Sequence, residues 1–332
     1  MSIMHFENQL IDLLKQVTSK YLHMPLLLSG GLDSTIICSL IKPKLTVVVS
    51  FGDQSEDLIH SRTVSQVYSN SHLEINIDFH KFKSLAANVV RILKTFDPIE
   101  VRNSTVLYAG IIGVKNMGYS DLVTGDGADE LFAGYSYLIR YYSEPRVLED
   151  VLRDLWDKMT FASKDIGTAL GVNIHTPYLE EPFISFAKSV NCHDKIGEKW
   201  GEKWGKYILR TTFENKLGDL VWRKKMALEH GSKLTSVSKI INKILSNTVF
   251  EVNIKQGLAD KVVLTTKEQM YYYWLYRSFF PAPYADSKGS IRCPYCLADI
   301  VKSTRYCQTC GSFPVEAVSN DITAGRSYTK NV

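Results

Sequence analysis

Short β-rich runs alternate with helix-length stretches from residue 24 to about residue 135, and this alternation restricts the fold more than any other feature. The runs expected to form strands are residues 25–29, 45–51, 72–77 and 121–124. Strands joined by helices form right-handed crossovers, which build a parallel sheet with helices on both faces. Ligands of such a sheet bind at the carboxyl ends of its strands. We therefore predict an α/β, doubly wound parallel sheet with its site just beyond the first strand.

The remainder of the chain has a helical pattern until a segment rich in helix breakers at residues 281–290. Helices are expected at residues 140–163, 181–190, 206–215, 232–245 and 267–280, and an amphipathic helix is expected at residues 1–21. We predict one domain over residues 1–285, with its sheet part at about 20–135 and its helical part at about 136–285. A small module over residues 291–316 and a mobile tail over residues 317–332 complete the predicted organisation.

Composition fits a globular enzyme, since 45% of the 332 residues are hydrophobic and 22% are charged. The apolar runs are far shorter than the roughly 18 residues that a membrane span requires. Charged residues interrupt the first helix, where a secretory signal needs an unbroken apolar core. Four of the six cysteines cluster near the C-terminus, which favours a metal site over disulfides. We expect a cytoplasmic protein with no membrane partner.

The sequence SGGLDST at residues 29–35 follows the first predicted strand and precedes an apolar helix. This arrangement points successive backbone N–H groups at an anion, and the glycines allow that anion to approach closely. Taken by itself, the motif is also consistent with an ordinary glycine turn in which Asp33 or Ser34 caps the helix. A GxxxxGK[ST] loop is absent, so γ-phosphoryl transfer is not expected.

Several motifs resemble one enzyme family, in that family's order, between about residue 20 and residue 285. SGGLDST resembles the pyrophosphate loop (PP-loop) of the ATP-pyrophosphatases, and TGDGADELFAGY at residues 124–135 resembles the second signature of the asparagine synthetase synthase domain. Residues 95–98 and 101–105 resemble the segment on the substrate side of that family, and residues 206–210 and 221–225 resemble its late lysine motifs. Residues 266–280 resemble its closing helix. The resemblance implies a fold like that of the adenine-nucleotide alpha hydrolases.

The resemblance also implies a role for each matching residue. Asp33 and Asp129 would hold a Mg²⁺ ion that bridges the ATP phosphates, because magnesium prefers hard oxygen ligands. Residues expected to hold the β and γ phosphates are Ser29, Gly30, Gly31, Ser34 and Thr35. Residues expected on the adenosine side are Leu28, Val49, Ser50 and Gly125.

Three further residues are candidates for catalysis. Lys206 and Lys225 would contact the α-phosphate and the leaving pyrophosphate, where a cation lowers the barrier as charge develops. Asp126 is expected to act as a polar orienting group or a base. Arg223 and Lys224 are interpreted as ordinary surface residues.

The segment at residues 171–180 aligns with a family segment that usually reads GVEARVPFLD, but Asn173 and His175 replace its charged Glu and Arg. Two interpretations stay open at this point. The substitutions are either a satisfied structural pair or a change in a carboxylate-binding pocket, in which case aspartate is not the acyl substrate.

Two Cys-x-x-Cys pairs near the C-terminus have the form of a zinc ribbon. Ten residues separate the pairs, and Gly311 follows the second pair. The four ligands would be Cys293, Cys296, Cys307 and Cys310. Because all four are thiolates, the zinc is expected to be structural.

Two classes of function are consistent with these motifs. The first is an ATP-dependent amidoligase that adenylates a carboxylate, with aspartate as one candidate, and releases AMP and pyrophosphate. The second is a PP-loop enzyme that adenylates a base of tRNA, with the mildly basic ribbon binding the RNA. TGDGADELFAGY favours the first class. A degenerate ATP-binding scaffold is a third reading, and the presence of Asp33, Asp129 and Lys225 counts against it.

The nitrogen donor of an amidoligase is a separate question. Glutamine-dependent asparagine synthetases begin with a glutaminase domain, whereas only 28 residues precede SGGLDST here. We therefore expect free ammonia, a separate glutaminase subunit or another amine to serve. Cys38 lies in the apolar helix behind the loop and is expected to be a buried small hydrophobic residue.

Overall fold

The computed structural model describes residues 3–301, 304–316, 318 and 319 of the chain. The chain forms two compact units. The first unit comprises residues 1–78 and 106–234, and the second comprises residues 79–105 and 235–332.

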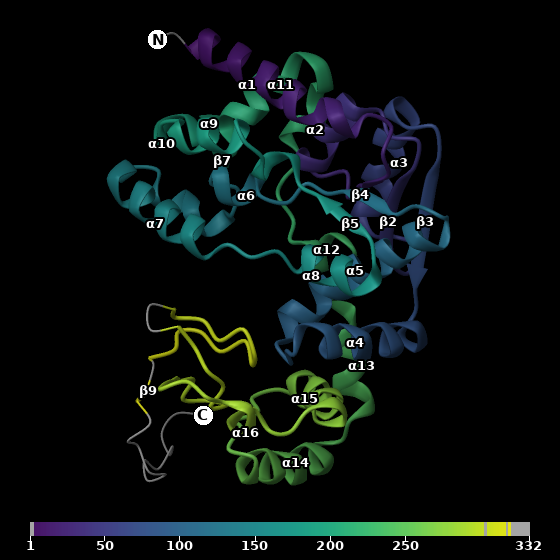
Figure 1. Ribbon diagram of the computed structural model, residues 1–332, viewed down its shortest axis with the longest axis vertical. Coiled ribbons are helices and arrows are strands. Elements are labelled where there is room, and N and C mark those ends of the chain that lie inside the picture. The colour runs from purple at the N-terminus through teal and green to yellow at the C-terminus, as the bar shows by residue number, and fades with distance from the viewer. Residues whose placement is uncertain (1–2, 302–303, 317, 320–332) are drawn as a thin grey trace. The chain divides into compact units, whose positions relative to one another are not determined.

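The first unit is built on a five-stranded parallel sheet with the strand order β3-β2-β1-β4-β5 (Figure 1). The strands are β1 (Leu26–Leu27), β2 (Thr46–Phe51), β3 (His72–Ile77), β4 (Asp121–Val123) and β5 (Asn173–His175). Leu26 pairs with Thr46 on one side and with Val123 on the other, so the strand order reverses between β1 and β4. The doubly wound α/β fold is therefore confirmed, and the loop after β1 lies at the switch point where such sheets bind ligands.

Helices enclose this sheet. They are α1 (Ile3–Thr18), α2 (Leu32–Ile41), α3 (Glu56–Tyr68), the later part of α5 (Pro98–Asn116), α6 (Ala128–Leu131), α7 (Pro145–Lys158), α8 (Ala162–Leu170), α9 (Phe183–Ser189), α10 (Cys192–Lys195), α11 (Tyr207–Leu217) and α12 (Leu228–Gly231). Four short 3₁₀ helices cover Ser19–Tyr21, Ser136–Tyr141, Pro177–Leu179 and Gly218–Trp222. None of the helices among the described residues is long and apolar enough to cross a membrane.

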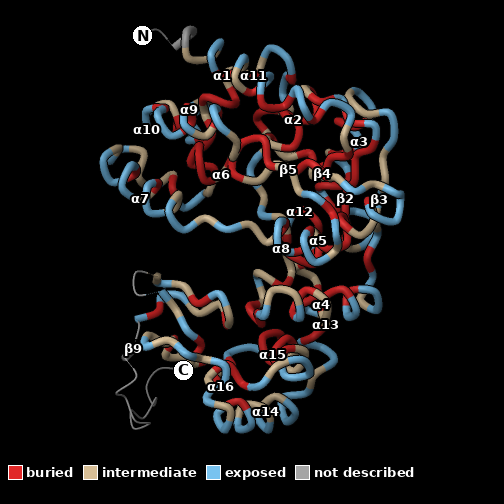
Figure 2. Tube along the Cα trace, in the orientation of Figure 1, coloured by how far each residue is buried: buried red, intermediate tan, exposed pale blue. Residues whose placement is uncertain are grey.

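The two faces of the sheet are covered by different helices. Leu26 and Leu28 are fully buried in a core shared with α1, α2 and α11, which lie close together in Figure 1. Leu27 points to the other face, where α5 approaches closely because it presents Gly110: a Cβ there would lie 2.6 Å from Leu27 Cδ1. β2 and β4 are mostly buried and appear red in Figure 2, whereas the edge strands β3 and β5 also contain exposed residues. Burial of the interior strands is expected where helices cover both faces of a parallel sheet.

The prediction that the chain is wholly helical after residue 135 is wrong in two places. β5 is a three-residue strand, too short to show an alternating pattern, and it is defined by its parallel pairing with β4. β6 (Ile196–Lys199) and β7 (Glu202–Gly205) form an antiparallel hairpin. Trp200 and Gly201 in its turn both have positive φ angles, of 56° and 75°, as a two-residue type I′ turn requires.

In the described part of the second unit, helices and one short strand pair are joined to a cysteine-rich segment of mostly irregular backbone. The unit contains α4 (Phe79–Leu93), the first part of α5, α13 (Ser236–Ile244), α14 (Asn247–Ala259), α15 (Lys267–Phe279) and α16 (Pro283–Asp286). Aromatic rings hold it together, since Phe82 contacts Tyr272 and Phe96 packs edge-on against Tyr273. β8 (Ile291–Arg292) and β9 (Val318–Ser319) pair antiparallel.

This division differs from the predicted domains. Residues 79–105 belong with the C-terminal half, because the buried face of α4 packs against α15. The cysteine-rich segment belongs to the same unit, and its prediction as a small module over residues 291–316 stays a prediction. Of the predicted tail, Val318 and Ser319 pair with β8, and the rest lies outside the described residues.

Candidate active site

The loop after β1 leads directly into α2. Gly30 has a φ of +67°, and a Cβ there would lie 2.6 Å from the backbone carbon of His60, so the loop needs glycine at this position. The first hydrogen bond of α2 runs from the Thr35 N–H to the Gly31 carbonyl, at 3.0 Å. The N–H groups of residues 32–34 therefore have no acceptor within the helix. Such a helix end is suited to binding an anion.

Two carboxylates and two ammonium groups meet beside this helix end. Lys206 Nζ lies 2.5 Å from Asp33 Oδ2 and 2.7 Å from Asp129 Oδ1, and the Lys206 side chain is only 3% exposed. Lys225 Nζ lies 2.5 Å from Asp129 Oδ2. Four residues that are distant in sequence thus form one balanced network, as buried charges require.

Backbone geometry places the members of this network. Lys206 precedes α11 with a positive φ of 56°, and its N–H donates to the Phe132 carbonyl at 2.9 Å. Gly134 lies against the pair, since a Cβ there would be 2.1 Å from both Asp129 Oδ1 and Lys206 Cε. The glycine at the end of TGDGADELFAGY therefore makes room for the lysine to reach the aspartate.

Two members of this network, Asp129 and Lys225, have pKa values that keep them charged at neutral pH. Although burial favours the neutral acid, Lys206 and Lys225 hold the pKa of Asp129 well below its ordinary value. Burial also opposes the charge of Lys225, but Asp129 and Asp33 raise the pKa of this lysine above its ordinary value. The site therefore keeps fixed charges of both signs where an anionic ligand with a cation would bind.

The oxygen atoms of the two carboxylates fit a magnesium ion. Asp33 Oδ1 and Asp129 Oδ1 are buried and accept no hydrogen bond from the described residues, although Lys206 Nζ lies near the second of them. Magnesium prefers hard oxygen donors and commonly takes one or two carboxylates beside phosphate and water. Asp33 and Asp129 are thus suitable ligands, and Mg²⁺ binding itself stays a prediction.

A cavity of about 220 Å³ opens at this network, within the first unit. Nine of the predicted site residues line it. They are Ser29, Gly31, Asp33, Ser34, Gly125, Asp126, Asp129, Lys206 and Lys225. The fold therefore brings the loop, the second signature and both lysine motifs to one place, as the resemblance implied.

Five predicted residues do not line this cavity: Leu28, Gly30, Thr35, Val49 and Ser50. Successive residues of a strand point to opposite faces, so Leu28 faces the core and Leu27 lines the cavity in its place. The Thr35 hydroxyl is buried without a hydrogen-bond partner. It stays a prediction that these five residues contact ATP, and their backbone atoms would make those contacts.

Arg223 corrects one prediction, because it is not a surface residue. Its side chain is 10% exposed, and its guanidinium donates at 2.9 Å both to Asp57 Oδ1 and to the Ser29 carbonyl. Lys224 is a surface residue as predicted, with its side chain 74% exposed beside Glu202. In the sequence, both appear within one run of basic residues, and only the fold separates them.

Asp57 and Arg210 are two cavity residues that the sequence reasoning missed. Burial raises the pKa of Asp57 to about 6, against the opposing effect of Arg223. Arg210 donates to the Gly205 carbonyl at 2.9 Å and to the Arg223 carbonyl at 3.1 Å, so it holds the chain that carries the lysine motif. No spacing in the sequence marks either residue.

Asp126 lies in the cavity wall and accepts hydrogen bonds from Thr124 Oγ1, at 2.9 Å, and Ser163 Oγ, at 2.5 Å. Burial raises the pKa of its carboxyl group, against the effect of these two hydroxyl groups. Its expected role as an orienting group or base stays a prediction.

Asn173 and His175 lie away from the cavity. His175 Nε2 is 2.9 Å from Asp121 Oδ1, and the Asn173 amide donates to the same oxygen at 3.2 Å. The His175 ring also packs on Tyr21. Of the two interpretations, the geometry supports a satisfied structural role, so these substitutions do not count against aspartate.

Comparison with known proteins identifies the family. The model of the family described as asparagine synthase matches residues 9–165 and 147–285, which together cover most of the chain. The chain belongs to the asparagine synthase family. It is 27% identical over 284 residues to "Asparagine synthetase B [glutamine-hydrolyzing]" of Escherichia coli (strain K12), with 78% of this chain and 50% of the relative covered. It is also 27% identical over 297 residues to "Probable asparagine synthetase [glutamine-hydrolyzing]" of Dictyostelium discoideum, with 78% and 51% covered.

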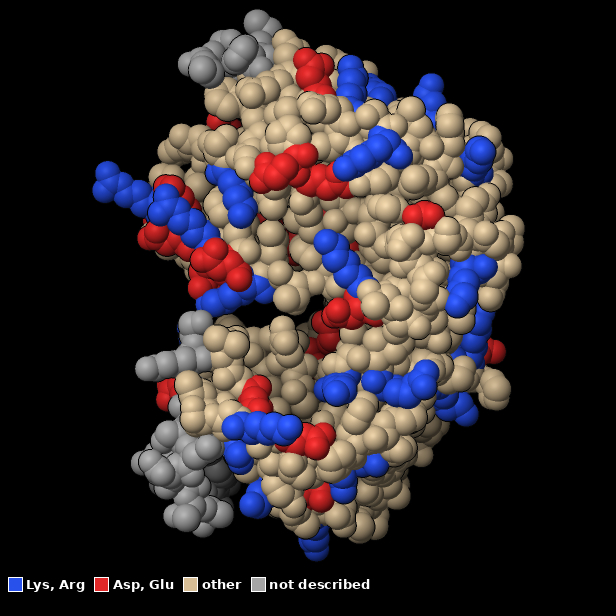
Figure 3. Space-filling view, viewed as in Figure 1, with Lys and Arg blue, Asp and Glu red and all other residues tan. Residues whose placement is uncertain are grey.

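The chain spans about half the length of these asparagine synthetases. Membership of the asparagine synthase family favours the amidoligase hypothesis over the tRNA-modification alternative. On the face drawn in Figure 3, basic and acidic side chains are interspersed, whereas RNA binding typically uses a clustered basic surface.

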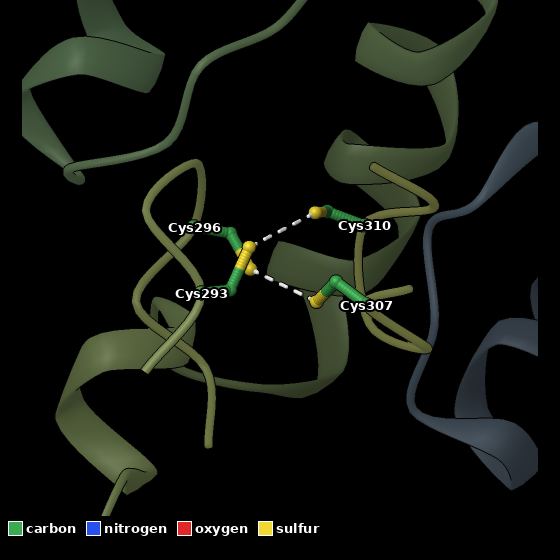
Figure 4. Close-up of side chains that lie close together, drawn as sticks. All are labelled: Cys293, Cys296, Cys307 and Cys310. Carbon is green, nitrogen blue, oxygen red and sulfur yellow. Dashed lines mark hydrogen bonds between the residues drawn. The ribbon is translucent and has the colours of Figure 1, made fainter. Parts of the chain in front are cut away.

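The match to the asparagine synthase family ends before the cysteine cluster. The four side chains point toward a common centre (Figure 4), and their sulfur atoms all lie within 4.8 Å of one another. Cys293 Sγ lies 3.8 Å from Cys310 Sγ, and Cys296 Sγ lies 3.7 Å from Cys307 Sγ. A tetrahedron of zinc–sulfur bonds about 2.3 Å long has edges of about 3.8 Å. The cluster thus has the dimensions of a zinc site, as the spacing predicted.

Proposed function

We propose that this chain is an ATP-dependent amidoligase that activates a carboxylate as its adenylate and transfers the acyl group to ammonia. The family match and the names of the relatives support this class of reaction. Aspartate is the first acyl substrate to test, because the names of the relatives specify asparagine synthesis. Magnesium and AMP formation are parts of the proposal.

The observation that carries the proposal is the meeting of Asp33, Asp129, Lys206 and Lys225 at the open end of α2. An α-helix N-terminus and two lysines provide positive potential for a polyphosphate. The Asp129 carboxylate and Asp33 Oδ1, which accepts no hydrogen bond from the described residues, would provide ligands for its metal ion. A site for a carboxylate alone would not need a pair of acidic side chains.

The chemistry proceeds in two balanced steps. A substrate carboxylate oxygen attacks the α-phosphorus of ATP, and the bond to the bridging oxygen breaks, so pyrophosphate leaves and an acyl adenylate forms. Ammonia then attacks the acyl carbon, AMP leaves, and the nitrogen loses one proton. Asp33 and Asp129 would hold the Mg²⁺ ion, which would neutralise negative charge on the ATP phosphates.

The residues of the chain contribute to both steps. Lys206 and Lys225 would stabilise the charge that builds up on the pyrophosphate and the α-phosphate. Arg223 fixes the end of β1 by its bond to the Ser29 carbonyl, which keeps the loop in place. Asp126, with its raised pKa, is positioned in the wall to accept the proton.

Chromatography of the reaction products tests the proposal. Purified protein with ATP, Mg²⁺, aspartate and ammonium should produce AMP, pyrophosphate and asparagine in equal amounts. Omitting aspartate or ammonium should stop formation of asparagine. Sustained production of ADP would refute the proposed cleavage between the α and β phosphates.

Ammonium is the proposed nitrogen donor for these 332 residues. A glutaminase needs an accessible activated nucleophile, but Cys38 is fully buried, and burial raises its pKa to about 12. The chain should therefore release no glutamate from glutamine, and glutamine should support synthesis only with a separate glutaminase present. Glutamate release by the purified chain would contradict this part of the proposal.

A further inference from the structure

The two Cys-x-x-Cys segments form equivalent turns, which we call the first knuckle (residues 293–298) and the second knuckle (residues 307–312). The Leu297 N–H donates to the Cys293 carbonyl at 2.9 Å, and the Gly311 N–H donates to the Cys307 carbonyl at 2.8 Å. Leu297 and Gly311 both have positive φ angles, of 57° and 78°. The backbone thus presents two similar pairs of sulfur atoms to one centre.

The second knuckle contacts the segment that precedes α5. The Thr95 hydroxyl donates to the Gln308 carbonyl at 2.7 Å, and the Phe96 N–H donates to the Thr309 carbonyl at 2.8 Å. The Tyr306 hydroxyl donates to Asp97. Three consecutive residues, Thr95 to Asp97, are therefore held by the chain around the second knuckle.

Both knuckles also bind the region around the start of α15. The Gln269 amide donates to the Cys310 carbonyl at 2.8 Å, and the Val263 N–H donates to the Tyr295 carbonyl at 2.8 Å. Backbone carbonyls of the cysteine-rich segment thus satisfy donors of three other parts of the second unit. An appended module that binds an external partner would not need these bonds.

A difference between the knuckles shows that one of them is built for this contact. The first knuckle accepts Leu297 at its left-handed position, so the turn by itself tolerates a side chain. A Cβ on Gly311 would lie 2.3 Å from Asp97 Oδ1 and 2.5 Å from its carboxyl carbon. Glycine is needed in the second knuckle because Asp97 packs directly against it.

We propose that Cys293, Cys296, Cys307 and Cys310 bind one zinc ion as thiolates, and that the loaded second knuckle fixes residues 95–97 ahead of α5. Each thiol loses its proton on binding. The cysteine-rich segment has few buried apolar side chains other than the cysteines themselves. The zinc ion therefore makes this segment rigid, and its backbone carbonyls stay in place to accept hydrogen bonds. This proposal is independent of the proposed reaction, because its test does not measure activity.

Metal analysis combined with hydrogen exchange tests the proposal on the full chain. Freshly purified reduced protein should hold one zinc per chain. Removing it with a strong chelator should speed exchange of the Phe96 and Val263 amides about five- to thirtyfold, because one or two net hydrogen bonds of about 1 kcal/mol each are lost. Adding zinc should restore protection. The Leu28 amide, which donates to the Val47 carbonyl at 2.8 Å in the first unit, is the internal control.

Matched variants separate the contact from the metal. Gly311→Ala should keep its zinc but speed exchange of the Phe96 amide at least about tenfold, whereas Leu297→Ala should change neither. Thr95→Val keeps nearly the same volume but removes the hydroxyl that donates to the Gln308 carbonyl and accepts from the Asp97 N–H. It should speed the same exchange at least about fivefold.

Three results would overturn the proposal. The first is purified protein without zinc. The second is an unchanged Phe96 exchange rate after the zinc has been removed. The third is equal loss of protection throughout α15 and at Phe96, because zinc would then support the whole unit and not this segment. If Gly311→Ala does not fold, wild-type Phe96 exchange in Thr95→Val would refute the contact.

Discussion

Replacing Gly134 with alanine tests whether the Lys206–Asp129 pair needs the space that glycine provides. The added Cβ would lie 2.1 Å from both Asp129 Oδ1 and Lys206 Cε, and 2.9 Å from Asp129 Cα. Ordinary contacts begin near 3.4 Å, so both side chains must move away from the added Cβ by about 1.3 Å. The 2.7 Å contact between Lys206 Nζ and Asp129 Oδ1 would then be lost.

The expected cost has two parts. Separating a buried ion pair destabilises a protein by about 3–5 kcal/mol, and Lys225 near Asp129 offsets part of this, so the unfolding free energy should fall by about 2–3 kcal/mol. Displacing a catalytic group by about 1 Å lowers turnover about 100-fold. Urea unfolding measures the first effect, and AMP formation measures the second.

Gly118→Ala is the matched control. Gly118 has a φ of +85° with nothing within 4 Å of an added Cβ, so alanine adds backbone strain of about 1 kcal/mol without a clash. Its turnover should equal that of the wild type. A Gly134→Ala variant with wild-type turnover and wild-type stability would show that the network is not held by this close approach.

Three more predictions concern charged groups of the cavity. Asp33→Asn and Asp129→Asn each remove a proposed metal ligand and should lower turnover at least about 100-fold at saturating Mg²⁺; near-normal rates in both would refute the ligand assignment. Lys225→Ala should lower the rate of AMP formation about 100-fold with little change in ATP affinity. Burial raises the pKa of Asp57 from 3.8 to about 6, so ionisation of this buried carboxyl costs stability as the pH rises through that range. Between about pH 4.5 and pH 7.5, this ionisation should lower the unfolding free energy of the wild type by about 2 kcal/mol, and Asp57→Asn should lack that decrease. Urea unfolding over this pH range measures the difference, and identical pH profiles would contradict the raised pKa.

The sequence alone predicted the type of fold and nine of the residues around the cavity. Alternating strand and helix patterns are local signals, since the period of apolar residues depends only on neighbours along the chain. β3 was predicted with its observed bounds, and β1, β2 and β4 within two residues. Asp33, Asp129, Lys206 and Lys225 were found because each belongs to a motif with a recognisable order. The four cysteines were found by spacing, because ligands of one ion in two turns need two short intervals.

Only the tertiary structure decided which groups contact one another. Arg223 and Lys224 are adjacent in one basic run, but one is buried against Asp57 and the other points to solvent. The motifs predicted Asp33 and Asp129 as ligands of Mg²⁺, and they predicted Lys206 as a separate catalytic residue. They did not reveal that the Lys206 ammonium contacts both carboxylates and would compete with the ion for them. Likewise, residues 79–105 join the cysteine-rich segment across more than 180 positions of the chain. Burial, ion pairing and close approach depend on groups that the fold brings together from distant segments of the chain. No local sequence pattern encodes the spatial distance between such groups.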